Sequence, residues 1–97
     1  MVYEVYFPVA DKSGVAHQPE LFRRAFDELA EQFGFVETWP VYRPLTETTE
    51  DVLESELYRF QIDVPNTTDN RLWLIRWRQA QDGSFGGDLW MVRYRLP

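Results

Sequence analysis

The stretch of residues 19–34 constrains the fold more than any other, because it predicts one amphipathic helix with a defined start and end. Pro19 suits the first helical turn, where its missing N–H would have no intrahelical partner, and Gly34 can adopt the left-handed conformation that ends a helix. The apolar residues between them recur at three- and four-residue spacing: Phe22, Ala25, Phe26, Leu29 and Phe33. We expect Phe35 to fold back onto the last turn. Such a helix needs an apolar surface to cover, so the rest of the chain should supply a sheet.

Three segments are predicted to be strands. Residues 2–9 and 56–64 alternate apolar and polar residues as half-buried strands do, and residues 35–43 are rich in β-branched and aromatic residues. In the first, Tyr3, Val5 and Phe7 share one face. Pro40 lies inside residues 35–43, and proline cannot donate to a strand ladder, so this strand should lie at an edge or carry a bulge there. Residues 44–55 are polar and acidic, which predicts a long connecting loop.

Residues 67–81 are compatible with two structures. As a strand, residues 71–78 would form a hairpin with residues 89–95, to which they are similar. As a helix, Thr67 or Thr68 would cap the start, Gly83 would close the end, and Trp73, Trp77 and Ala80 would share a face. We favour the helix, because the two caps are farther apart than a typical strand is long and a second helix supplies the crossover to a last strand.

Three runs in the second half resemble a known group of proteins: ELYRFQIDVPNT (56–67), NRLWLIRWR (70–78) and FGGDLWMV (85–92). They are similar to a group of small uncharacterised bacterial proteins with a ferredoxin-like βαββαβ layout. The resemblance implies that layout and assigns no activity to any residue. Gly87 departs from the group, which usually has a polar residue there.

The whole chain, residues 1–97, is therefore predicted to form one α+β domain. We expect a ferredoxin-like sandwich with two helices on one face of a four-stranded antiparallel sheet, in the strand order 4-1-3-2.

Composition limits the classes of partner. The formal net charge of −6 argues against nucleic acid, because phosphate binding depends on clustered Lys and Arg. The absence of cysteine excludes disulfides and thiolate metal sites. No apolar run approaches the roughly 18 residues that a membrane span needs. We expect a cytoplasmic protein without a membrane partner.

No constellation of residues predicts catalysis or a cofactor. His17 is the single imidazole, and it lacks the partners of a triad or a metal site. The acids of the 44–56 loop do not match the spacing of a calcium-binding loop. These acids are Glu47, Glu50, Asp51 and Glu54. We therefore predict neither a cofactor nor a metal site.

The sheet face opposite the helices is the strongest candidate binding surface, because Tyr, Met and Arg are enriched at interfaces. Its predicted residues are Tyr6, Tyr42, Leu57, Arg59, Met91 and Arg93. The leading hypothesis is a non-catalytic interaction or small-ligand-binding module, of unknown ligand, that forms a homodimer through this face.

Two other functions stay open. One is a dimeric α+β barrel enzyme, an oxygenase or isomerase acting on a hydrophobic substrate, which rests on fold analogy. In that enzyme His17 and Trp39 would line a pocket together with Tyr6 and Arg59. The other is binding of a basic partner through the acidic loop of residues 44–56.

Overall fold

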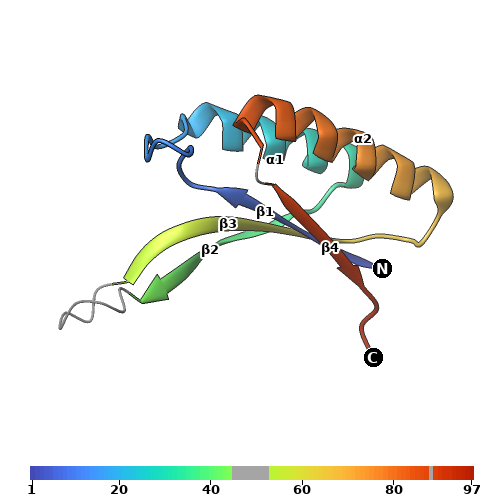
Figure 1. The fold of residues 1–97 in the computed structure, drawn as a ribbon. Helices are drawn as coiled ribbons and strands as arrows, with labels where there is room; N and C mark the ends of the chain where they lie inside the picture. The colour runs from blue at the N-terminus through green and yellow to red at the C-terminus, as the bar shows by residue number, and fades with distance from the viewer. Residues whose placement is uncertain (45–52, 88) are drawn as a thin grey trace.

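The computed structural model describes residues 1–44, 53–87 and 89–97, with side chains for 1–38, 57–87 and 89–97. Its elements are, in order, β1 (Val2–Pro8), α1 (Pro19–Phe33), β2 (Glu37–Pro44), β3 (Leu53–Asp63), α2 (Thr68–Phe85) and β4 (Trp90–Tyr94). The strands form one antiparallel sheet in the order β2-β3-β1-β4, which is the predicted 4-1-3-2 order read from the other edge. Both helices lie over the same face of the sheet (Figure 1). The predicted α+β architecture is confirmed.

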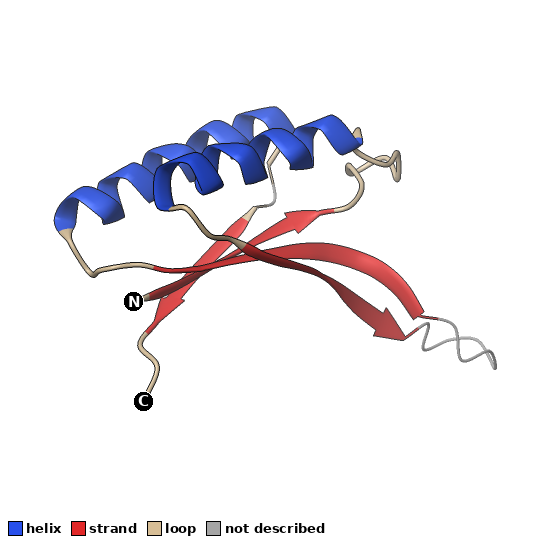
Figure 2. Ribbon diagram, turned by 180° about the vertical axis from the view of Figure 1, so that it is seen from behind, coloured by secondary structure: helices blue, strands red, loops and turns tan. Residues whose placement is uncertain are grey.

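The two faces of the sheet are thereby unequal. In the view from behind, the helices form one layer and the sheet forms the other, with no second layer beneath it in the described part of the chain (Figure 2). We call the side that packs against α1 and α2 the covered face and the other side the open face.

Helix α1 has the predicted bounds. It starts at Pro19 and ends before Gly34, whose φ is 87° and whose N–H donates to the carbonyl oxygen of Ala30 at 2.7 Å. The expectation for Phe35 is wrong, because this side chain is 71% exposed. The next residue, Val36, enters the core in its place as the chain turns toward β2.

Residues 68–85 are helical, so the helical interpretation of the ambiguous segment, residues 67–81, is confirmed. The Thr67 hydroxyl accepts a hydrogen bond from the backbone N–H of Asn70 at 3.1 Å, which is the predicted N-cap. The predicted end at Gly83 is wrong, because α2 continues to Phe85 and closes at Gly86, where φ is 77°. The extra residues bring the Phe85 ring into the core.

The buried face of α2 also differs in part from the prediction. Leu74, Trp77, Gln81 and Phe85 are buried at the three- and four-residue spacing of one helix face. Trp77 was predicted on this face, whereas Ala80 is exposed.

The core lies between the helices and the covered face, and Phe7 is at its centre. This side chain is fully buried. Its ring centroid lies 4.7 Å from that of Phe60, 4.9 Å from that of Phe85 and 5.8 Å from that of Trp77. Rings from β3 and α2 therefore pack around one side chain of β1, on the face where the alternation of β1 places it.

Strand β2 lies at an edge, as Pro40 requires. The register of β2 against β3 also shifts between Val41 and Tyr42, directly after the proline. Both consequences expected of this residue are thus present. The predicted loop of residues 44–55 is wrong at both ends, because β2 includes Pro44 and β3 begins at Leu53. Residues 45–52 lie outside the described residues, as does residue 88.

Candidate functional site

The open face is built around Glu4 on the central strand β1. Its carboxylate is only 7% exposed although it lies on the side without helices. The hydroxyl of Tyr6 donates to Oε2 and the hydroxyl of Tyr94 donates to Oε1, each at 2.6 Å. The Arg59 Nη1 atom lies 3.9 Å from Oε1. Side chains of three adjacent strands therefore converge on one carboxylate.

These contacts change the acidity of the groups involved. Burial raises the pKa of Glu4, but the hydrogen bonds from Tyr6 and Tyr94 and the charge of Arg59 outweigh it, so the pKa lies below its ordinary value. The hydrogen bond to Glu4 raises the pKa of each tyrosine hydroxyl. At neutral pH the carboxylate is ionised and both tyrosines are protonated, which is the state that makes all of these bonds.

An apolar row runs beside this cluster along the edge strand β4. Trp90 is 58% exposed, Val92 44% and Tyr94 38%. The register pairs Trp90 with Tyr6 and Val92 with Glu4, which places the row on the open face. The Trp90 and Tyr6 rings meet edge to face, with centroids 5.9 Å apart. The open face therefore carries large apolar side chains next to a fixed polar centre.

Two predicted members of this face lie on the other side. Met91 pairs with Val5 and Arg93 pairs with Tyr3, so both belong to the covered face. Met91 packs against the core. The prediction that Met91 and Arg93 line the open face is wrong, because the pairing of β4 with β1 is shifted by one residue from the expected parity, and such a shift exchanges the two faces.

Three predicted members do lie on the open face: Tyr6, Leu57 and Arg59. The register pairs Tyr6 with Arg59 and Pro8 with Leu57. The side chains of Tyr42 and Trp39 lie outside the described part of the structure. Glu4, Trp90, Val92 and Tyr94 were missed, although Glu4 is the one acid within the first strand segment and was a readable signal.

A second candidate site is a cavity on the covered face, between α1 and the strands β2 and β3. Its volume is about 380 Å³. Its walls are Val9, His17, Pro19, Phe22, Arg23, Phe26, Thr38, Tyr58 and Phe60. The His17 Nε2 atom is buried and has no hydrogen-bond partner among the described residues. His17, named from the sequence as the single imidazole, therefore lines a cavity.

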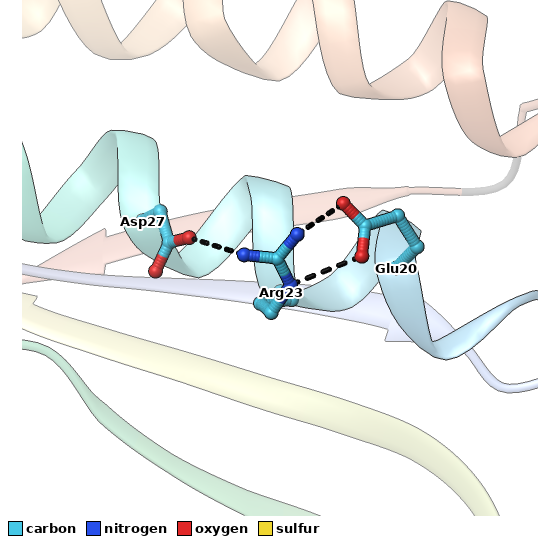
Figure 3. Close-up of polar contacts among 3 residues, drawn as sticks. All are labelled: Glu20, Arg23 and Asp27. Atoms are coloured by element: carbon cyan, nitrogen blue, oxygen red, sulfur yellow. Dashed lines mark hydrogen bonds and ion pairs between the residues drawn. The ribbon is translucent and has the colours of Figure 1, made fainter.

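Arg23 lines this cavity. Figure 3 shows that two carboxylates of the same helix compensate its charge. Its guanidinium donates to both carboxylate oxygens of Glu20, with Nε 3.0 Å from Oε2, and Nη1 donates to Asp27 at 3.3 Å. The hydrogen bond from Arg23 lowers the pKa of Glu20. The spacing of these residues along α1 is the i, i+3 and i, i+4 spacing of helical ion pairs.

Three residues of the enzyme hypothesis do not come together within one chain, and the side chain of the fourth, Trp39, lies outside the described residues. His17 lies at the covered face, whereas Tyr6 and Arg59 lie on the open face, so the sheet separates them. Within the described ranges, no three His, Asp or Glu side chains are grouped so as to hold a metal ion. No described helix is both long and apolar enough to cross a membrane.

Comparison with known proteins adds no relative to this geometry. No family model matches the chain, and searches of the curated proteins and of the solved structures found no significant match.

Proposed function

We propose that this chain is a non-catalytic interaction module that forms a homodimer through the open face of its sheet. We also propose that the fold is ferredoxin-like and that the chain is related to the small uncharacterised bacterial proteins that it resembles in sequence. The element order β1-α1-β2-β3-α2-β4 and the strand order support that layout.

The observation that carries the dimer is the direction in which β4 presents its side chains. A strand whose outer face meets water normally turns its polar residues outward. Strand β4 departs from this rule: Trp90, Val92 and Tyr94 face outward, while of its two covered-face residues Met91 packs against the core and Arg93 is exposed. Exposed apolar residues grouped on one face are typical of a surface that a partner covers.

The polar centre of the face favours a second copy of the chain. Glu4 is already held by two tyrosines and Arg59, and Asp63, at the end of the same face, lies 3.4 Å from the N-terminal amine. Glu4 and Asp63 therefore bring little uncompensated charge into an interface, although the chain as a whole carries −6.

Rigidity agrees with this occupant. The Tyr6 and Tyr94 side chains are held by hydrogen bonds before any partner arrives. Less side-chain entropy is then lost on association. Because a two-fold dimer apposes the same patch on both copies, one substitution changes both sides of the interface.

Sedimentation velocity over a wide concentration range tests the proposal. We expect a species of twice the 11.6 kDa chain mass, which Trp90→Glu and Val92→Glu weaken at least about tenfold by introducing charge into the buried patch. Leu72→Glu is the matched control, because Leu72 on α2 has the same exposed fraction as Val92, 44%. Wild-type protein that stays monomeric near 1 mM contradicts the dimer.

A second variant separates face-to-face packing from pairing of two β4 edges. Gln61 lies opposite Glu4 and Glu37, away from the β4 edge. Gln61→Lys places a cation near two acids within one chain, which does not disturb the monomer. A face-to-face dimer, however, would hold the new lysine of each copy in the same interface, where the two cations repel each other. We expect it to weaken the dimer as Val92→Glu does. A dimer that tolerates Gln61→Lys while losing stability with Val92→Glu contradicts the face-to-face arrangement.

A further inference from the structure

We propose that the free edge of β4 binds an extended acidic segment of a partner protein. The segment joins the sheet as an additional strand and places its carboxylates against arginines of α2 and β4. This site is a strand edge, so it does not rest on the proposed dimer, which uses the open face of the sheet.

The two edges of the sheet differ in their protection. Strand β2 carries Pro40 and a shift of register between Val41 and Tyr42, and both features hinder the addition of another strand. Strand β4 contains no proline, and its register with β1 is unbroken. It pairs with β1 alone, and no backbone hydrogen bond joins its other side to a described residue. The N–H and C=O groups on that side are therefore available to a segment of another chain.

Three arginines, which we call the edge arginines, lie along β4 on the side of the helices. The Arg78 Nη2 atom donates to the carbonyl oxygen of Leu89, directly before β4, at 3.2 Å. Arg71 lies about two turns earlier on α2, so it projects from the same side of the helix. Because β4 runs back beneath α2, Arg71 lies toward the end of β4 (Figure 1). There Arg93 is on the covered face, opposite Tyr3, and is exposed.

The charges of the edge arginines are not compensated within the described residues. On α1, by contrast, Glu20 and Asp27 both pair with Arg23. No described acid forms an ion pair with an edge arginine. Asp82, on the same side of α2, instead accepts a hydrogen bond from the backbone N–H of Leu89 at 3.4 Å. The edge arginines are therefore available to carboxylates from outside the chain, which a guanidinium binds through two parallel hydrogen bonds.

The charge of this edge decides which segment fits. Side chains of an added strand alternate between the two faces, so every second residue would point toward the edge arginines, and an acid at those positions is complementary to them. A second copy of β4 is not, because two-fold pairing of two β4 edges would bring the edge arginines of both copies to the same side of the joined sheet. Nucleic acid is disfavoured by the net charge of −6.

Fluorescence anisotropy with a labelled synthetic peptide, Thr-Glu-Val-Glu-Val-Glu-Thr, tests the site. We expect saturable binding to the full chain and no binding of the peptide in which lysine replaces each glutamate. Methylating the backbone nitrogens of the central Val-Glu-Val keeps the charge but removes donors on both sides of the peptide, and should weaken binding about tenfold. Amide hydrogen exchange of residues 90–94 should slow when the unmethylated peptide binds.

Substitutions outside the strand ladder test the charges. Arg71→Gln and Arg93→Gln should each weaken the peptide about fivefold, the effect of one exposed ion pair. Arg76→Gln is the matched control, because it makes the same change in charge at an exposed position on the opposite side of α2. Gln61→Lys, which weakens the proposed dimer away from this edge, should bind the peptide at least as tightly as wild type does, so failure of the dimer leaves this result unchanged.

Four outcomes overturn the inference. They are absence of saturable peptide binding, equal weakening by Arg76→Gln and Arg93→Gln, unchanged amide exchange in residues 90–94, and displacement of the peptide by an equal concentration of polyuridylate, which would assign the edge arginines to nucleic acid.

Discussion

The two faces of the sheet use the same strands in opposite ways. On the covered face, Phe7 is packed by rings from β3, α1 and α2. On the open face, the neighbouring residue Tyr6 makes one ring contact with Trp90 and one hydrogen bond with Glu4. The covered face is complete within one chain, whereas the open face has a fixed polar centre and an uncovered apolar row.

This difference separates stability from recognition. Contacts on the covered face remove apolar area from water, which is the main stabilising contribution to folding. The polar centre of the open face contributes little net free energy, because its hydrogen bonds replace bonds to water. It does fix the positions of Tyr6 and Tyr94. We therefore expect substitutions on the two faces to act on different measurements.

The largest expected effect follows from truncating adjacent residues on opposite faces. Phe7→Ala should lower the free energy of unfolding by about 3–5 kcal/mol, because it leaves a cavity among fixed rings. Tyr6→Ala should lower it by only about 1–2 kcal/mol, for one lost hydrogen bond and one ring contact. Both are measured by urea unfolding in the Val92→Glu background, so that dimer dissociation does not contribute.

Because Phe7→Ala removes a large part of the stability of a small domain, Phe7→Leu gives a milder test, with an expected loss of about 1–1.5 kcal/mol. Equal losses for Tyr6→Ala and Phe7→Ala would show that the open face is also core.

The next effect concerns pH and the open face alone. The pKa of Glu4 is lower in the folded protein, so its stabilising contribution is complete above the ordinary value of 4.5 and is lost as the pH falls through the folded value. Glu4→Gln removes this titration. We expect it to lower the free energy of unfolding by about 1–2 kcal/mol at pH 7, with the difference from wild type shrinking below pH 4.5.

Tyr94→Phe supplies the control for that experiment. It removes one hydrogen bond to Glu4 without changing the charge, so the pKa of Glu4 should move up toward its ordinary value. Carboxyl ¹³C NMR measures the shift directly. A Glu4 titration that Tyr94→Phe leaves in place would mean that this hydrogen bond does not stabilise the carboxylate.

The sequence predicted the features that neighbouring residues determine. Pro19, Gly34 and Thr67 are local signals, and each has the predicted role at a helix end. The edge position of β2 follows from the missing N–H of Pro40 alone. The alternation of β1 predicted the covered-face residues Tyr3, Val5 and Phe7, which are buried, but not the burial of Val2 and Glu4 on the other face.

Features that depend on contacts between distant segments were not predictable in the same way. Met91 and Arg93 were assigned to the wrong face because β4 has apolar residues in both parities, Trp90 and Val92 in one and Met91 in the other, and only the pairing with β1 decides between them. The sequence named His17 as a pocket residue of the enzyme hypothesis but grouped it with Tyr6 and Arg59, since the observed cavity exists only where α1 docks on β2 and β3. Two glycines, Gly83 and Gly86, could each end α2.

The smallest expected effects test where helix α2 ends, and they use Gly83 and Gly86. Gly83 lies inside α2 and a Cβ there would meet nothing within 4 Å, so Gly83→Ala should raise the free energy of unfolding by about 0.5–1 kcal/mol. Gly86 has a φ of 77°, so Gly86→Ala should lower it by about 1 kcal/mol. If the helix ended at Gly83, the two signs would exchange, and Phe85 would lose the helical position that brings its ring to Phe7. Urea unfolding of the two variants therefore decides whether α2 covers the sheet as far as Phe85.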